Sequence, residues 1–593
     1  MAHQFHIPVL GLAFSVDTPI KVAHLGITSV ISIVDDELLE RMRAFHASQA
    51  GLPYSPITKN SPDHRARRIE AYLNLVQFLV RGNFKRLQHG DFTTSNALQT
   101  YFDLLPDPHP LKEAYSRMIA EKDPIIKQHM QTSLRQNMSP GKIEVNIMSK
   151  VDKLNSDHLN RPLNEAFSDA LAALRGVAHS ELNGSLVLSA GMNPRLYSYL
   201  GELPQFQNHS SEPCKKEIIL KVSDYRSALI QAKFLAKKRI WISEFRIESG
   251  LNCGGHAFAT EGYLLGPILE EFKQKKTELI QELQELYRNA GDQTPSDMRF
   301  PPTRFTVQGG IGTAAEQQFL LDQYQLDGTG WGSPFLLVPE ATTVDTETLQ
   351  QLAAAAHTDF YVSGASPLGV PFNNFRRSTA EKQRLERIKS GRPGSPCTKK
   401  YLVSNTEFTS EPICTASRKY QHKKIKQLQN ADLALEEYQR QLNDVLEKTC
   451  LCEGLASSAY LKNNLLKPKE NPAVAICPGP NIAWFNRSYS LREMVDHIYG
   501  RIDLLLHAGE RPNLFINELE LYLQHLQKFI EQNNHSLSDK KEKYISKFKS
   551  RLEEGIHYYE ALQDRFHHLG NLFSPRSLLQ LEKAKLELKR IGS

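Results

Sequence analysis

Residues 304–332 read RFTVQGGIGTAAEQQFLLDQYQLDGTGWG. A short β-branched run is followed by a Gly-Gly turn, a helical stretch and a second short run rich in glycine. This β-α-β order predicts two neighbouring parallel strands joined by a helix. Glycine weakens regular structure, so the Gly309–Gly310 step indicates that the backbone closely approaches another group at this turn.

The same alternation continues toward the N-terminus. Eight strand-helix units predict a closed (β/α)8 TIM barrel, an α/β fold. The expected strands cover residues 8–14, 28–34, 142–148, 185–190, 217–223, 239–247, 304–308 and 327–332.

The pattern divides the chain into three regions. Residues 1–375 are expected to form the barrel, with 35–140 as a large helical insertion after the second strand. Residues 376–484 form a basic, loop-rich segment that is expected to return to the barrel, and 485–593 are helical. The apolar faces of these last helices are expected to pack against the barrel or against a second copy in a homodimer.

Composition excludes several classes of protein. Hydrophobic residues make up 40% of the 593 residues and the net charge is +6, which argues against disorder and demands no nucleic acid. The apolar run at 7–14 is too short to span a membrane, and the C-terminal helices carry mixed charges, so no membrane partner is expected. Seven cysteines without framework spacing favour a reducing, cytoplasmic location.

The turns after the last two expected strands are candidates for binding phosphate. In a TIM barrel, ligands lie at the C-terminal ends of the strands, and phosphate often binds after strands seven and eight. Backbone N–H groups at such turns can face an anion. The expected binding residues are Gln308, Gly309 and Gly310 after the seventh strand, and Gly332 and Ser333 after the eighth.

Three further places in the chain could contact a flat heterocycle: the loop 254–256, Asn146 and Lys221. The stretch GLNCGGH (250–256) places Gly254 and Gly255, which suit contact with a ring, beside His256. A histidine can exchange protons near neutral pH, although a helix-capping role is the alternative. Asn146 could bind a ring edge or belong to a structural turn, and Lys221 could bind an anionic edge or be a solvated rim residue.

Five cysteines and a basic run invite other interpretations. Cys450 and Cys452, with Cys397, Cys414 and Cys477, lack the C-x2-C spacing of zinc and cluster sites, so we expect buried thiols and no metal. The basic run 376–426 is expected to be a solvated surface, with steering of an anionic carrier as the alternative.

Five motifs taken together resemble a known family. IPVLGLAFSVDTP, EVNIM, GLNCGGH, QGGIG and GWGSPF occur in the order and spacing of the nitronate monooxygenase (2-nitropropane dioxygenase-like) family, which includes flavin-dependent enoyl-acyl-carrier-protein reductases. The resemblance covers roughly residues 6–375. The chain departs from the family at four positions, because Asn252 and Cys253 stand where Glu-Ala is usual, Trp331 replaces Met and Pro334 replaces Arg.

The resemblance implies a TIM barrel that holds FMN non-covalently. It implies that Ala13 contacts the flavin through its backbone, that Asn146 is the family asparagine, and that His256 is the general base of nitroalkane oxidation. Gly309, Gly310, Gly332 and Ser333 match the family's phosphate loops.

The expected function is therefore that of an FMN-dependent oxidoreductase. The first expectation is oxidation of a nitronate or nitroalkane with O2. The alternative is an NAD(P)H-dependent reductase of enoyl thioesters carried by acyl carrier protein or coenzyme A. A third reading, from another class, is a flavin-binding or flavin-lost scaffold for protein partners.

Overall fold

The computed structural model covers the chain from end to end. It describes residues 2–148, 152–155, 161–189, 191–207, 216–256, 261–290, 299–505, 511–533, 538–566 and 575–591.

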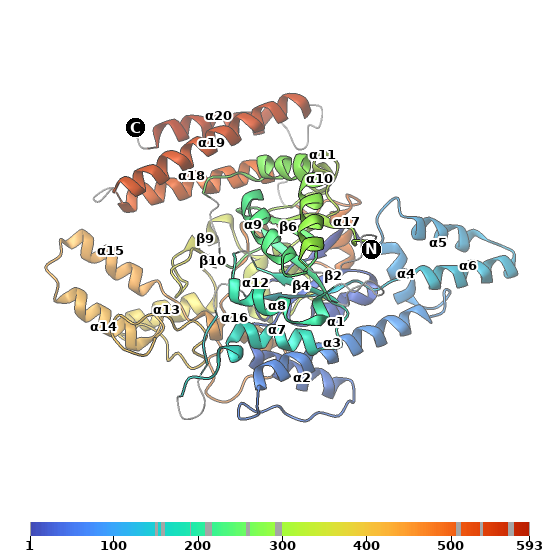
Figure 1. Cartoon of the computed structure of the whole chain (residues 1–593), viewed down its shortest axis with the longest axis horizontal. Coiled ribbons are helices and arrows are strands. Elements are labelled where there is room, and N and C mark those ends of the chain that lie inside the picture. The colour runs from blue at the N-terminus through green and yellow to red at the C-terminus, as the bar shows by residue number, and fades with distance from the viewer. Residues whose placement is uncertain are drawn as a thin grey trace.

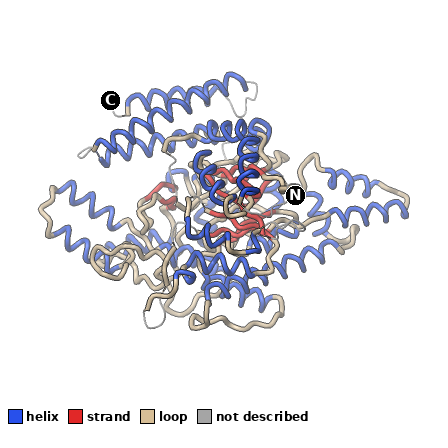
Figure 2. The backbone as a smooth tube through the Cα atoms, in the orientation of Figure 1, coloured by secondary structure: helices blue, strands red, loops and turns tan. Residues whose placement is uncertain are grey.

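Eight parallel strands form a closed barrel in sequence order, with β1 pairing with both β2 and β8. The strands lie together at the centre of the molecule and helices surround them (Figure 2). The predicted (β/α)8 barrel is thus confirmed. The strands are β1 (Phe5–Ile7), β2 (Thr28–Ser32), β3 (Ile143–Ile147), β4 (Gly184–Leu188), β5 (Lys216–Val222), β6 (Ile242–Glu248), β7 (Arg304–Gln308) and β8 (Gly328–Gly330).

The first strand was predicted in the wrong place. The expected strand 8–14 is a turn, and β1 instead covers Phe5–Ile7. Pro8 has no N–H to donate to a ladder, and Gly11 has a φ of +89°, which an extended strand does not use. The three residues directly before Pro8 therefore form the strand, and the apolar run that starts at Pro8 forms a loop. Ala190, the last residue of the fourth expected strand, lies outside the described residues.

A ring of helices covers the outside of the barrel (Figure 1). Most of these helices begin at a side-chain cap, such as Thr313, which forms a capping box with Glu316 at the start of α11. The ring contains α1 (Thr18–Val22), α3 (His64–Gln88), α7 (Asp169–His179), α8 (Pro194–Gly201), α9 (Tyr225–Ala236), α10 (Leu265–Asn289), α11 (Ala314–Tyr324) and α12 (Thr346–Ala353).

The stretch 35–140 contains five helices. Its longest, α3, packs against α7, and a Cβ at Gly176 of α7 would lie 2.6 Å from the Ala66 carbonyl oxygen of α3. Glycine therefore allows this close helix contact. The other four helices are α2 (Asp36–Gln49), α4 (Asn96–Leu104), α5 (Pro110–Ala120) and α6 (Pro124–Asn137), and α5 and α6 extend away from the barrel in Figure 1.

The stretch 376–484 is more helical than expected. Its helices are α13 (Thr379–Lys389), α14 (Arg418–Gln429), α15 (Leu435–Leu446) and α16 (Leu451–Lys462), and a hairpin of β9 (Phe360–Ser363) and β10 (Phe372–Phe375) precedes them. α16 returns to the barrel, because the Leu455 carbonyl accepts the Ala13 N–H at 3.1 Å.

The helices α18 (Leu514–Asn533), α19 (Asp539–Phe566) and α20 (Pro575–Arg590) form a layer on one side of the barrel helices (Figure 1). Both α18 and α19 pack against α10, whereas α17 (Leu491–Ile498) packs against α4 and α11. Among the described residues, no helix combines the length and apolar character needed to cross a membrane.

Candidate functional site

Polar side chains line the C-terminal mouth of the barrel. Lys221 Nζ at the end of β5 lies 3.0 Å from Glu248 Oε2 at the end of β6. Gln308 Nε2, at the end of β7, donates to Glu248 Oε1 at 2.7 Å. Asn146, near the end of β3, makes no side-chain hydrogen bond to any described residue. The mouth therefore combines a charged pair with an amide that has donors and acceptors to offer.

Buried charges support this layer from below. Arg246 on β6 is 1% exposed and donates to Glu144 Oε2 at 2.7 Å and to Glu244 Oε1 at 2.8 Å. Burial lowers the pKa of His6, whose Nε2 lies 3.4 Å from Gln308 Oε1, so this imidazole is neutral. A buried charged network of this kind costs free energy unless all its members are paired, and it holds the mouth residues in one arrangement.

The two glycine turns close on the loop that carries His256. A Cβ at Gly309 would lie 2.9 Å from the Asn252 Cα, and a Cβ at Gly332 would lie 2.7 Å from the Cys253 Cβ. Only glycine permits these approaches, and Gly309 also has a φ of +101°. The structure thus brings the ends of β6, β7 and β8 together, as the sequence predicts.

Three backbone donors on these turns stay open. The N–H groups of Gly310, Gly332 and Ser333 donate to no partner among the residues that the structure describes. Gly332 and Ser333 are buried. Because an unpaired buried N–H is costly, these donors indicate a place for an acceptor such as a phosphate oxygen.

Other groups at these turns are already used by the protein. Burial raises the pKa of the Cys253 thiol, whose sulfur would lie 3.0 Å from a Cβ at Gly332. The Ser333 hydroxyl donates to the Cys253 carbonyl at 3.2 Å and accepts the Gly479 N–H at 2.7 Å. The serine side chain therefore holds two loops together, and only its N–H is open to a ligand.

The two glycines before His256 differ in their surroundings. A Cβ at Gly254 would lie 2.2 Å from the Cys477 carbonyl oxygen, so this residue packs against the returning segment. Gly255 has a φ of +84°, and a Cβ built there would meet no atom within 4 Å. One face of Gly255 therefore borders open space.

His256 is held by a serine and a phenylalanine. Its Nε2 lies 2.8 Å from the Ser366 Oγ, and its ring packs edge-on against Phe372 at 5.2 Å between centroids. The Asn252 side chain donates to the His256 carbonyl at 3.1 Å. These contacts fix the imidazole in the loop. Asn252, four residues earlier in the same loop, is the residue that packs against Gly309.

Ala13 differs from the glycine turns in how its backbone groups are used. Its N–H donates to Leu455, and its carbonyl accepts the Val16 N–H at 3.3 Å. Both backbone groups are therefore engaged within the protein, so contact with a flavin there would use the Cα and Cβ surface.

Two residues of the C-terminal stretch reach the site without any sequence signal. Arg511 donates to the Gly310 carbonyl at 2.8 Å, to Glu316 Oε1 at 2.7 Å and to Asn481 Oδ1 at 3.0 Å. Glu518 accepts the N–H groups of Gly250 and Leu265, each at 2.7 Å, and so holds both ends of the loop that carries His256. Neither residue belongs to a local sequence motif. Only their contacts with turns that are far away in the sequence show that they hold the site's loops in place.

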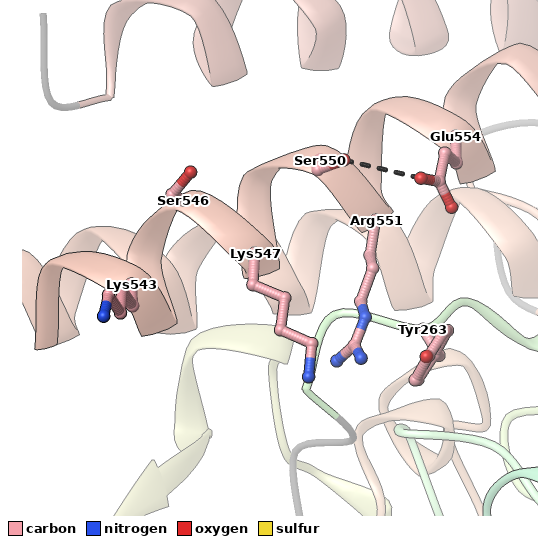
Figure 3. A pocket seen from close by; sticks show the side chains of 7 residues that line it. All are labelled: Tyr263, Lys543, Ser546, Lys547, Ser550, Arg551 and Glu554. Atoms are coloured by element: carbon pink, nitrogen blue, oxygen red, sulfur yellow. Dashed lines mark hydrogen bonds between the residues drawn. The ribbon is translucent and has the colours of Figure 1, made fainter. Parts of the chain in front are cut away.

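A separate cavity lies beside the same loop. Its volume is about 390 Å³, and Tyr263 faces Lys547 and Arg551 of α19 across it (Figure 3). Lys547 and Arg551 approach Glu261 at 3.4 and 2.7 Å, and Arg551 stacks on the Tyr263 ring at 3.8 Å. Lys543, Ser546, Ser550 and Glu554 complete the lining.

The residues at the mouth fit a flavin mononucleotide. Gly310, Gly332 and Ser333 offer N–H groups for its phosphate, and the open face of Gly255 and the Asn146 amide suit its ring. Among the described residues, no group of three or more His, Cys, Asp or Glu side chains is arranged to hold a metal ion.

Comparison with known proteins adds similarity in structure only. No protein-family model and no curated protein matches the chain. Among solved structures, the chain is similar to FabK from Thermotoga maritima, with 12% identity over 66% of this chain and 88% of that chain and a TM-score of 0.31. It is also similar to the enoyl reductase domain of MlnA from the macrolactin biosynthesis cluster of Bacillus amyloliquefaciens, with 13% identity over 66% and 86% and a TM-score of 0.34. Similarity at this level carries no conclusion about activity.

Proposed function

We propose that this chain is an FMN-dependent oxidoreductase. The observation that carries the proposal is the set of open N–H groups on Gly310, Gly332 and Ser333, at the ends of two adjacent parallel strands. Hydrogen bonds from these groups to a phosphate would be charge-assisted, and they would give partners to the buried N–H groups of Gly332 and Ser333.

The ring would lie over the polar mouth. Gly255 offers a face without a side chain, and Asn146 can donate to or accept from the edge of a heterocycle. The Lys221–Glu248 pair and Gln308 supply further polar atoms at the same level. When bound, the flavin supplies two-electron transfer, and the protein supplies binding, orientation and proton transfer.

We propose oxidation of a nitronate or nitroalkane as the reaction. His256 is the proton-transferring residue, since an imidazole can take a proton from a carbon made acidic by a nitro group. Ser366 and Phe372 keep the ring in one orientation, so the acceptor nitrogen is positioned before substrate binds.

An anaerobic screen of electron donors tests this reaction. The yellow protein is mixed without oxygen with a nitronate, a neutral nitroalkane, NADH or NADPH, and the flavin absorbance is followed. Bleaching by the nitronate and not by the dinucleotides supports the proposal. His256→Ala is expected to slow reduction by the neutral nitroalkane about 100-fold or more and to spare reduction by the preformed nitronate.

The cavity beside Tyr263 favours a second candidate, reduction of an enoyl thioester. Lys543, Lys547 and Arg551 outnumber the nearby Glu261 and Glu554, and the remaining positive charge suits the phosphates of a dinucleotide or of a thioester carrier (Figure 3). Bleaching by NADH or NADPH, followed by reoxidation with an enoyl thioester, would establish this reaction and overturn nitronate oxidation.

A further inference from the structure

Four cysteines gather at one place in the segment 376–484. Cys397, Cys414, Cys450 and Cys452 line a cavity of about 10 Å³, and all four are free thiols. A cavity of this size holds no more than about one water molecule, so it has no room for an organic ligand.

Two of these thiols come from chain segments that pair with each other. The Ser395 N–H donates to the Ala416 carbonyl at 2.9 Å, and the Arg418 N–H donates to the Ser395 carbonyl at 2.9 Å. Cys397 and Cys414 therefore lie on paired segments, and both line the same small cavity.

A second backbone pair holds the other side of Cys414. Asn405 and Ile413 exchange N–H to carbonyl hydrogen bonds of 3.1 and 2.8 Å. The residues on both sides of Cys414 are therefore held by backbone hydrogen bonds.

The two thiols differ in environment. Cys397 is partly exposed, and the hydrogen bond from Cys414, with the N–H and charge of Lys400, lowers its pKa to about 7. Cys414 is buried, and its pKa is raised by its hydrogen bond to Cys397 and by burial. Burial likewise raises the pKa of Cys450 and of Cys452. A thiol that ionises near neutral pH therefore lines the same cavity as a thiol that stays protonated, which suits an attacking and a resolving cysteine.

We propose that Cys397 and Cys414 form a redox-active dithiol that a hydroperoxide oxidises to a disulfide. The Cys397 thiolate attacks the O–O bond of hydrogen peroxide, which gives a sulfenic acid and hydroxide. The Cys414 thiol then attacks that sulfur, the S–S bond forms and water leaves. Two thiols lose two electrons and two protons, and the peroxide is reduced to two waters. This site is independent of the proposed flavin site.

Mass spectrometry of the full-length reduced protein tests the pair. The protein is treated with hydrogen peroxide, its remaining thiols are alkylated, and the digest is searched for linked peptides. We expect one linked pair that joins Cys397 to Cys414. The rate of its formation should fall about tenfold from pH 8 to pH 6, as the fraction of Cys397 thiolate falls.

Two variants separate this pair from its neighbours. Cys414→Ser should leave a sulfenic acid on Cys397 that dimedone traps, and the double variant Cys450→Ser, Cys452→Ser should still form the 397–414 link. A link through Cys450 or Cys452, no link at all, or a bound zinc ion that Cys397→Ser releases would each overturn the proposal. The first measurement uses the unmodified chain, so misfolding of a variant does not prevent the test.

Discussion

At the scale of single residues, Gly309 and Gly255 look alike in sequence and differ in what surrounds them. A Cβ at Gly309 meets backbone atoms of Asn252, whereas a Cβ at Gly255 meets no atom within 4 Å. Both have positive φ values, which an alanine adopts only with strain.

This contrast predicts different effects of two alanine variants. Gly309→Ala should lower the free energy of unfolding by about 3 kcal/mol or more, because strain adds to a backbone clash. Gly255→Ala should cost only about 1 kcal/mol, yet weaken FMN binding about tenfold or more, because the added methyl group enters the proposed ring site. Urea denaturation and FMN titration measure the two effects. Equal losses of stability would contradict the geometry.

Glu518 predicts a pH effect on stability. Burial raises the pKa of its carboxyl group from 4.5 to about 7. The unfolded chain therefore releases this proton at lower pH than the folded chain, and stability falls as pH rises from 4.5 to about 7. The loss from this residue is about 3 kcal/mol across that window.

Glu518→Gln should remove this part of the pH dependence, because the amide does not ionise. The free energy of unfolding of both proteins is measured at about pH 5 and about pH 8. The wild type should lose more stability than the variant between the two conditions. An identical change in both proteins would show that Glu518 does not titrate in this range.

Residue types at turns could be predicted from the sequence, and long-range partners could not. The glycines at 309, 310 and 332 stand where the barrel rule expects them, and the structure brings them to one place. Arg511 and Glu518 have ordinary neighbours in the sequence, so nothing local indicates that they contact Gly310 and Gly250.

At the scale of elements, the alternation of strands and helices in the sequence predicts the barrel, but it does not predict where the first strand lies. Buried parallel strands read as short apolar runs, which the sequence shows for six of the eight. β8 reads Gly-Thr-Gly, and β1 is only three residues long with His6 at its centre. The longer apolar run 8–14 contains a proline and a glycine that prevent pairing.

The segment that precedes α18 links the C-terminal helices to the barrel. The Arg511–Glu316 pair joins Nη1 and Oε1 at 2.7 Å, and its side chains are 3% and 1% exposed. Glu316 Oε1 also accepts the Leu514 N–H at the start of α18. The Gly309–Gly310 turn and the C-terminal layer are therefore joined through one buried ion pair.

Arg511→Met should break this link. Removing one member of a buried pair costs about 3–5 kcal/mol, since the other charge is left without a partner. Arg492→Met is the matched control, because Arg492 pairs with Asp103 and its side chain is 51% exposed. Losing this exposed pair should lower the free energy of unfolding by less than about 1 kcal/mol. The two variants are compared by their denaturation midpoints. Similar midpoints would show that Arg511 does not stabilise the link between the C-terminal helices and the barrel.

At the scale of the whole molecule, segments from five parts of the chain meet at the barrel mouth. The loops after β6, β7 and β8 supply the turns, Gly479 donates to Ser333, and Arg511 and Glu518 come from the C-terminal stretch. The regions added to the barrel are thus part of the site's structure, and no local sequence feature indicates the contacts of Arg511 and Glu518.

The central claim is that the turns after β7 and β8 hold the phosphate of a flavin mononucleotide. The most direct test compares the affinities of the unmodified protein for FMN and for riboflavin, which lacks the phosphate, by equilibrium dialysis. Three charge-assisted hydrogen bonds from Gly310, Gly332 and Ser333 should make FMN bind at least about 100-fold more tightly. Equal affinity for the two flavins, or no binding of either, would contradict the account.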